Sequence, residues 1–253
     1  MTISPSTRIK AIKQTLRKQI LREDAPVRAL ERLFVVGVGA SAGGLGACQK
    51  FIAAIPPGSG LVFILVQHLD PTHESMMVDL LKKHAPVAVV QAAEGMLIER
   101  DHFYIIPPGA YLSASNGALH LSYPQSSHGV RLPYDFLLHS LADSYGAGAA
   151  AVVLSGTGTD GSLGVEALKA KGGMVFVQDP GEAEHDGMPQ SAIQTGVADL
   201  VLPAAEIPAA ILKYREKKSL GKTVKKSADP SQSSLRKIIA LLHDCLLYTS
   251  RCV

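Results

Sequence analysis

Three polar residues follow apolar runs that have the character of buried strands. Ser41 comes after LFVVGVGA (33–40), His68 closes LVFILVQH (61–68), and Asp160 lies in GTGTDG (156–161), after AAAVVLSG. A hydroxyl, an imidazole and a carboxylate are the three groups of nucleophilic acyl transfer. We therefore predict a Ser-His-Asp triad. Its order along the chain is no objection, because triads are recognised by geometry and role.

The segment GVGASAGG (37–44) fits two templates. As Gly39-x-Ser41-x-Gly43 it is a nucleophile elbow, in which glycines free a sharp turn and the next helix offers unpaired N–H groups to an oxyanion. As Gly37-x-Gly39-x-x-Ala42 it is a dinucleotide-binding turn. The second template requires an acidic residue at the end of the second strand, where the chain has Gln67-His68. The hydrolase interpretation is favoured.

Each group also has a structural alternative. Ser41 is of a type that caps helices, His68 of a type common at the surface, and Asp160 stands where it would cap the helix that follows it. A metal site is a further alternative, since four possible ligands crowd one loop: His68, Asp70, His73 and Glu74. Their spacing matches no zinc-hydrolase pattern, and loop residues of this kind are more often solvated, so we do not expect a metal.

Apolar runs alternate with helical patterns across the middle of the chain. Strands are expected in 33–40, 61–68, 87–93, 149–156, 174–179 and 198–203, and helices near 45–55, 75–84, 134–145, 163–170, 190 and 205–214. Strands that are apolar on both faces indicate a parallel sheet covered on both sides. Asn116-Gly117 predicts a β-hairpin insertion. We predict an α/β, Rossmann-like, doubly wound and mostly parallel sheet, with its chemistry at the carboxyl ends of the strands.

Composition narrows the function classes. The chain has 253 residues, 47% of them hydrophobic, with no Trp and three Cys. The absence of Trp and the low aromatic content argue against stacking on single-stranded nucleic acid. No apolar run reaches the ~20 residues of a membrane span, and no secretory signal precedes the first strand. We expect a cytoplasmic protein that neither binds nucleic acid nor inserts into a membrane.

Charge and composition also divide the chain. Residues 1–32 carry eight Lys/Arg against three acidic residues, residues 215–253 carry nine against three, and residues 33–214 carry eight against sixteen. We expect a basic lead-in helix or linker (1–32), a catalytic domain (33–214) and a flexible basic linker (215–234). Residues 235–253 have the pattern of a helix cut short and followed by a tail of non-native character. We expect them to be the truncated start of a following domain.

Five ordered motifs, GASAGG, QHLDP, YIIPPG, LSGTGTDG and QDP…GMPQSAI, together resemble the catalytic domain of chemotaxis-type protein-glutamate methylesterases (CheB-like). The resemblance covers residues 33–214. It implies a triad of Ser41, His68 and Asp160, with the backbone N–H groups of Ala42 and Thr157 as oxyanion donors. It also implies hydrolysis of glutamyl methyl esters on chemoreceptor-type proteins, and in many members deamidation of glutamine. The resemblance further implies that no cofactor is bound. Arg131, Met188 and Pro189 fall in stretches that border the family's site, so they are candidates for substrate contact.

The chain also departs from the family's pattern. Ala42 stands where a Thr is frequent and Thr157 where a Met is frequent, although backbone donors survive both changes. No receiver domain fits before residue 33. The motifs are closest to methylesterases fused to a methyltransferase and sensory modules, so we expect fused domains of that kind. The main alternative is a catalytically silent docking or regulatory domain. A nucleotide-binding Rossmann protein is a third.

Overall fold

The computed structural model describes residues 33–67, 76–123 and 131–226. The chain divides after Ala209 into two compact units. The first unit contains all the strands that the structure describes, together with α2 to α6. Helix α7 (Ile207–Lys226) begins in the first unit and continues in the second.

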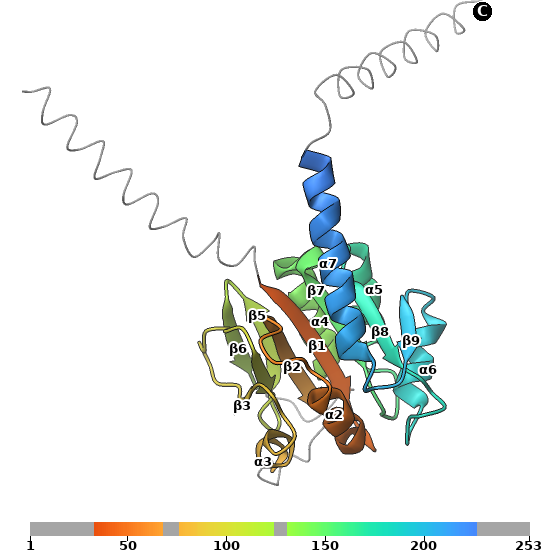
Figure 1. Ribbon diagram of the computed structural model, residues 1–253. Coiled ribbons are helices and arrows are strands. Elements are labelled where there is room, and N and C mark those ends of the chain that lie inside the picture. Colours follow the sequence, from red (N-terminus) through yellow and green to blue (C-terminus); the bar gives the residue numbers. More distant parts are fainter. Residues whose placement is uncertain (1–32, 68–75, 124–130, 227–253) are drawn as a thin grey trace, which may run out of the picture. The chain divides into compact units, whose positions relative to one another are not determined.

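A seven-stranded sheet forms the centre of the first unit (Figure 1), and all its strand pairs are parallel. The strand order is β3-β4-β2-β1-β7-β8-β9. Its members are β1 (Phe34–Ala40), β2 (Leu61–Gln67), β3 (Ala88–Gln91), β4 (His102–Ile105), β7 (Ala149–Val153), β8 (Met174–Gln178) and β9 (Leu200–Leu202). Because β1 has β2 on one side and β7 on the other, the winding direction reverses at β1. The predicted doubly wound fold is confirmed.

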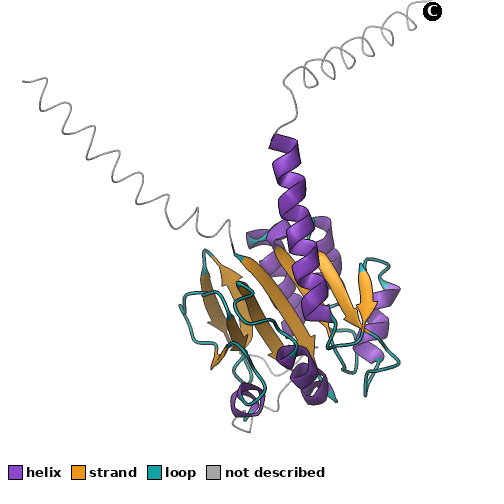
Figure 2. Ribbon diagram, in the orientation of Figure 1, coloured by secondary structure: helices purple, strands orange, loops and turns teal. Residues whose placement is uncertain are grey.

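Helices cover both faces of the sheet, as Figures 1 and 2 show. On one face, α2 (Gly44–Ala53) places Phe51 against Phe63 of β2, with ring centroids 5.7 Å apart. On the other face, α4 (Pro133–Ser144) and α5 (Ser162–Ala170) join Val35, Val153 and their neighbours in one apolar cluster. The shorter helices are α3 (Met77–Lys82) and α6 (Gly187–Gln194). Strands buried on both faces are therefore apolar at successive positions, which is the pattern in the sequence.

The predicted hairpin is present as β5 (Tyr111–Ser115) and β6 (Ala118–Ser122), paired in antiparallel register. Its turn has φ of 51° at Asn116 and 77° at Gly117, as a type I′ turn requires. The hairpin packs on α4, where Ser140 Oγ accepts a hydrogen bond from the Ala114 N–H at 3.1 Å. It therefore extends the apolar layer on that face of the sheet.

Two elements differ from the expectation. Strand β4 was not predicted, although it lies inside the sheet between β3 and β2; it is only four residues long and is bounded by charged residues and prolines, which hide it. Helix α7 continues to Lys226, so residues 215–226 are helical where a flexible linker was expected. That segment contains no proline, and extending an existing helix avoids the cost of nucleation.

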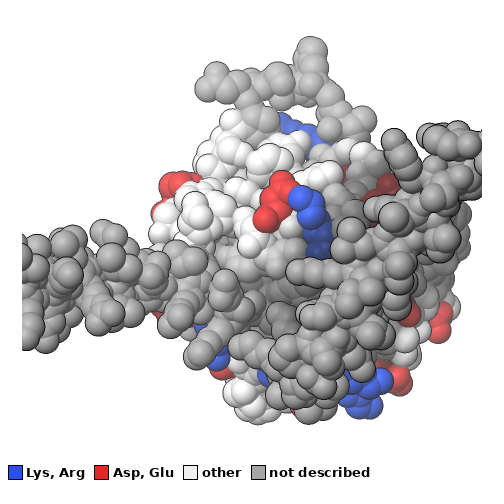
Figure 3. All heavy atoms as spheres, turned by 90° about the horizontal axis from the view of Figure 1, so that it is seen from above, with Lys and Arg blue, Asp and Glu red and all other residues white. Residues whose placement is uncertain are grey.

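The face shown in Figure 3 carries acidic and basic side chains of the described residues, interspersed with uncharged surface. Within the described ranges, no helix combines the length and apolar content that crossing a bilayer would need.

Candidate active site

The site that the sequence predicts lies where the winding of the sheet reverses. In the register of the parallel strands, Ala40 of β1 pairs with Gln67 of β2, and Gly39 pairs with Val153 of β7. The three strands therefore end at nearly the same level. Ligands of open α/β sheets bind at such a point, outside the carboxyl ends of the strands. The residue after Ala40 is Ser41, and the residue after Gln67 is His68.

The turn after β1 holds Ser41 in a fixed position. Its N–H donates to the Ser155 carbonyl at 3.0 Å, and its carbonyl accepts from the Gly44 N–H at 2.9 Å. Gly43 has φ of 66°, and a Cβ there would lie 2.7 Å from Glu184 Cβ, so the position requires glycine. Gly43 is also the N-cap of α2, which has no side-chain cap. The alternative in which Ser41 serves as the helix cap is therefore wrong.

The loop after β7 lies directly against Ser41. A Cβ on Gly156 would lie 2.9 Å from Ser41 Cβ and 2.3 Å from Met188 Sδ. The Gly156 N–H donates to the His185 carbonyl at 2.9 Å, and the Gly156 carbonyl accepts from the Met188 N–H at 2.8 Å. Both polar groups of Gly156 are thus engaged by residues 185–188. This pairing fixes the path of the loop that continues into Thr157.

Two backbone donors beside Ser41 are available to a ligand. Ala42 and Thr157 are exposed, and within the described residues neither of their N–H groups donates a hydrogen bond. Ala42 follows Ser41 in the chain and Thr157 follows Gly156, and Gly156 lies directly against Ser41. Unpaired backbone N–H groups at a strand-to-helix turn are the usual donors of an oxyanion hole.

Asp160 is buried, with 6% of its surface exposed. Its Oδ2 accepts from the Tyr134 N–H at 3.0 Å and its Oδ1 from the Asp135 N–H at 2.9 Å. It therefore caps the N-terminus of α4, not that of the helix which follows it. The positive end of that helix dipole favours an ionised carboxylate. Two bonds do not exhaust the accepting capacity of a carboxylate, so this role is compatible with orienting an imidazole.

The cap on α5 comes from α4 in return. Asp135 is 5% exposed, and its Oδ1 accepts from the Gly164 N–H at 2.6 Å. The N-termini of α4 and α5 are thus each closed by a carboxylate near the start of the other helix. This exchange fixes Asp160 relative to the sheet, and no sequence pattern predicted it.

Tyr134 fills the space beneath this pair of caps. Its hydroxyl lies 3.0 Å from the Gly37 carbonyl and 2.9 Å from the Val152 carbonyl, and accepts from the Val152 N–H at 3.2 Å. A Cβ on Gly39 would lie 2.3 Å from its ring, and one on Gly161 2.4 Å. Burial, more than any other effect, raises the pKa of Tyr134 well above its usual value. The phenol therefore stays neutral and serves as a spacer between β1 and the loop that carries Asp160.

Three further polar side chains support the site and were missed from the sequence: Ser155, Gln178 and Glu182. Ser155 Oγ accepts from the His185 N–H at 3.0 Å and lies 3.1 Å from the Ala42 carbonyl, to which it donates. Ser155 and Gln178 both follow apolar strand residues at the carboxyl edge, so the rule that singled out Ser41 applies to them as well. Gln67 also meets that rule; its Oε1 is buried and has no hydrogen-bond partner among the described residues.

Other predicted site residues fall in different places. His68 lies outside the described residues, as do the possible metal ligands Asp70, His73 and Glu74, so the contact between His68 and Asp160 stays a prediction. Arg131 is exposed just before α4. Met188 and Pro189 are buried, with Met188 only 1% exposed, and Met188 packs against Gly156. Among the described residues, no group of three or more His, Cys, Asp or Glu is arranged to hold a metal ion.

Cys48 is a second residue of nucleophilic type, on α2. Its side chain is fully buried, and that burial raises the pKa of the thiol to about 12. A thiol that stays protonated and inaccessible does not attack substrates. Ser41, in contrast, is partly exposed at the carboxyl edge of the sheet.

Comparisons with known proteins point in the same direction. The protein-glutamate methylesterase/protein-glutamine glutaminase of Pyrococcus horikoshii is 32% identical over 186 residues, which are 72% of this chain and 50% of that protein. The enzyme of the same name from Nitrosospira multiformis is 32% identical over 198 residues, or 78% of this chain and 54% of that protein. The chain thus spans about half the length of these relatives.

Two other matches differ in extent. An uncharacterized 104.1 kDa protein of Rhodobacter capsulatus is 40% identical over 138 residues, which are 54% of this chain but 14% of that protein. The crystal structure of the Thermotoga maritima CheB methylesterase catalytic domain superposes with a TM-score of 0.67 at 31% identity, covering 72% of this chain and 98% of that one. The sequence model of the CheB methylesterase family matches residues 36–211. Both the turn that carries Ser41 and the loop that carries Asp160 lie within that match, and the chain belongs to the CheB methylesterase family.

Proposed function

We propose that residues 33–214 form a serine hydrolase that removes methyl groups from glutamyl methyl esters on chemoreceptor-type signalling proteins. The names of the relatives from Pyrococcus and Nitrosospira support the removal of methyl groups from protein glutamates, and the resemblance stated above adds chemoreceptor-type proteins as the substrate. Those names include glutaminase activity, so hydrolysis of glutamine side chains belongs to the same proposal.

The observation that carries the proposal is the shared level of three strand ends. Pairing of Ala40 with Gln67 and of Gly39 with Val153 aligns the positions from which Ser41, His68 and the Asp160 loop leave the sheet. Neighbouring strands lie about 4.8 Å apart, a separation that side chains of this size can bridge. The N–H groups of Ala42 and Thr157 supply the oxyanion donors.

The chemistry follows from these positions. His68 takes the proton of Ser41 Oγ as that oxygen attacks the ester carbonyl, and Asp160 holds the imidazole in the required tautomer. The N–H groups of Ala42 and Thr157 bind the oxyanion. The tetrahedral intermediate expels methanol, which receives the proton from His68. Water then attacks the glutamyl-enzyme with the same imidazole as base, giving a glutamate carboxylate and free Ser41.

The proposed substrate is a side chain on a large receptor, so the site must be open to solvent. The described part of the site meets this requirement. Ala42 and Thr157 are exposed and border the reacting position. Met188 and Pro189 provide a firm apolar wall, while exposed Arg131 is placed to contact the receptor surface. These three contacts are part of the proposal.

The test is hydrolysis of a methylated chemoreceptor fragment, measured as the release of methanol. Ser41→Ala is expected to lower kcat by about 10⁴–10⁶-fold, as in other triads. Ser113→Ala is the matched control, because it removes another partly buried serine hydroxyl from the β5–β6 hairpin. Methanol release by Ser41→Ala near the rate of the parent would refute the mechanism. A folded parent that releases no methanol, and whose Ser41 no fluorophosphonate labels, would instead indicate a docking domain.

We also propose that this domain works inside a longer signalling protein, joined to methyltransferase or sensory domains. The 104.1 kDa size of the Rhodobacter relative, of which the chain covers 14%, supports a larger architecture.

A further inference from the structure

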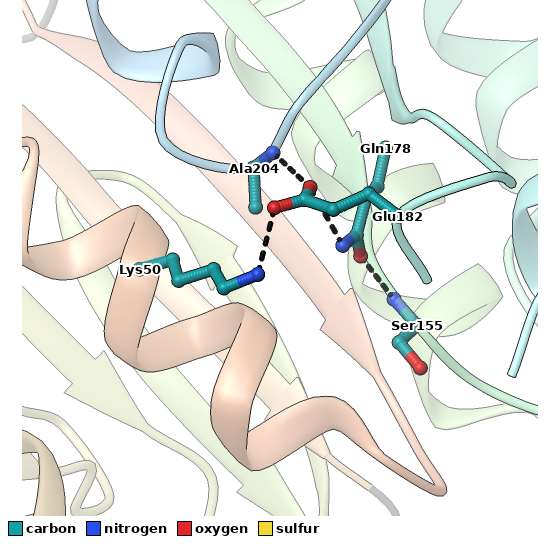
Figure 4. Close-up of polar contacts among 5 residues, drawn as sticks. All are labelled: Lys50, Ser155, Gln178, Glu182 and Ala204. Atoms are coloured by element: carbon teal, nitrogen blue, oxygen red, sulfur yellow. Dashed lines mark hydrogen bonds and ion pairs between the residues drawn. The ribbon is translucent and has the colours of Figure 1, made fainter. Parts of the chain in front are cut away.

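A closed ring of contacts joins the nucleophile turn to α2, and Figure 4 shows the part of it from Lys50 to Ser155. Lys50 on α2 donates to Glu182 Oε1 at 2.9 Å, Gln178 Nε2 donates to Glu182 Oε2 at 3.1 Å, and the Ser155 N–H donates to Gln178 Oε1 at 2.8 Å. The Ser155 carbonyl then accepts from the Ser41 N–H at 3.0 Å. Ser41 precedes α2, so the backbone of the helix completes the ring to Lys50.

We propose that Gln178 and its partners Glu182 and Lys50 are positioning residues of the esterase: through Ser155 they set the distance between the nucleophile Ser41 and the oxyanion loop. This inference rests on the proposed function. We do not assign any of the three side chains a contact with the substrate. Each acts through Ser155.

Gln178 is suited to this task because it is buried and fully engaged at both ends. Only 1% of its surface is exposed. The Ser155 N–H requires an acceptor and the Glu182 carboxylate requires a donor, so only one orientation of the amide satisfies both neighbours. A rotated amide would set its N–H group against the Ser155 N–H and its oxygen against the Glu182 carboxylate, so both hydrogen bonds would be lost. The amide therefore fixes the Ser155 backbone in one position.

Glu182 anchors the ring outside the sheet edge. Besides Lys50 and Gln178, its carboxylate accepts the Ala204 N–H at 2.7 Å, which ties it to the segment after β9. Partial burial pushes the pKa of Glu182 upward, but the hydrogen bonds from Ala204, Lys50 and Gln178 outweigh it and leave the pKa below its usual value. The carboxylate is thus charged at neutral pH and holds three donors together.

Ser155 passes this restraint to both halves of the catalytic machinery. Its carbonyl holds Ser41, its hydroxyl holds the Ala42 carbonyl and the His185 N–H, and Thr157 follows two residues later. A displacement of Ser155 would move the attacking oxygen and the oxyanion donor relative to each other. Misplacement by about 1 Å at a reacting centre costs on the order of 10²-fold in rate.

The experiment compares variants of Lys50. Its side chain is 56% exposed, so replacing it creates no cavity in the core. Lys50→Met breaks the ring and Lys50→Arg preserves the ion pair. Lys171→Met is the matched control, since Lys171 is 57% exposed and pairs with Asp143 away from the ring. Gln178→Met removes the central amide. Two quantities are measured: the maximal rate of Ser41 labelling by a fluorophosphonate, with its half-saturation concentration, and the amide hydrogen exchange of Ser41 and Ser155.

We expect Gln178→Met to slow labelling by about 10–100-fold and Lys50→Met by about 3–10-fold, with the half-saturation concentration changed less than about two-fold. Lys50→Arg and Lys171→Met should stay within about two-fold of the parent. Amide exchange at Ser41 and Ser155 should accelerate in Lys50→Met and not in the two controls.

The outcomes separate the two proposals. If Lys50→Met matches Lys171→Met in both labelling and exchange, the ring transmits nothing and the inference is overturned. If the parent protein releases no methanol and is not labelled, the proposed function fails. The exchange rates then still decide whether the ring holds the Ser41 turn.

Discussion

Asp160 and Asp135 are two buried aspartates that make the same kind of helix cap from different places in the fold. Each closes the N-terminus of a helix to which it does not belong, through bonds of 3.0 Å or less from its carboxylate to backbone N–H groups. Asp160 lies in the loop that leaves β7 at the carboxyl edge. Asp135 lies within α4, and its carboxylate is turned to α5. Helix capping therefore does not set the two aspartates apart, and the catalytic role proposed for Asp160 rests on its position at the sheet edge.

The largest difference between the two aspartates is expected when each is neutralised in turn. Asp160→Asn and Asp135→Asn both keep their size and one acceptor, and each should lower the free energy of unfolding by about 1–3 kcal/mol. Only Asp160→Asn should also lower kcat, by about 10³–10⁴-fold, because the imidazole loses the partner that fixes its tautomer. Urea unfolding and methanol release measure the two effects. Equal kcat values in the two variants would show that Asp160 is only a cap.

A second test addresses Tyr134, which packs between β1 and the loop that carries Asp160. Gly39→Ala places a methyl group 2.3 Å from the Tyr134 ring, so the ring must move. We expect a loss of about 1–3 kcal/mol in the free energy of unfolding from overpacking.

The control for that test is Gly46→Ala on α2, where no atom lies within 4 Å of the added Cβ. It should gain about 0.5–1 kcal/mol from helix propensity. Thermal unfolding of both variants measures the difference. If Gly39→Ala were as stable as Gly46→Ala, the spacer role of Tyr134 would be lost.

The smallest effect concerns Glu182, a third carboxylate that binds a backbone N–H but lies nearer the surface. Its pKa is lowered in the folded protein, so its contribution to stability is present above its usual pKa of 4.5 and is lost as pH falls through the lowered value. Urea unfolding between about pH 6 and pH 3 should therefore show a difference between the parent and Glu182→Gln that shrinks on acidification. A difference that is constant with pH would show that the charge of Glu182 does not matter.

The architecture was largely predictable because its strands are buried on both faces. Runs such as LVFILVQ and AAAVV left no plausible alternative to a covered parallel sheet, and Asn116-Gly117 specified the hairpin. Strand β4 escaped because its order depends on pairing with β2 and β3, not on its own four residues. The extension of α7 escaped because its charged residues form helix as readily as they form a solvated linker.

For the site, the rule of polar residues at strand ends singled out Ser41 and Asp160, whose roles stay predictions. The same rule would have found Ser155 and Gln178, had it been applied to residues other than the types needed for a triad. The exchange of caps between Asp160 and Asp135 was out of reach, because it depends on how α4 and α5 approach each other. That approach is set by packing between segments far apart in the sequence.

The placement of β1 between β2 and β7 has a consequence for biosynthesis. Its second neighbour spans Ala149–Val153, more than a hundred residues farther along the chain. Until the ribosome has released that stretch, β1 has a bare side, and Ser41 lacks the Ser155 carbonyl that fastens its turn. The proposed hydrolase site would therefore be complete only late in translation, and products of premature termination before β7 would expose an unpaired strand edge prone to self-association.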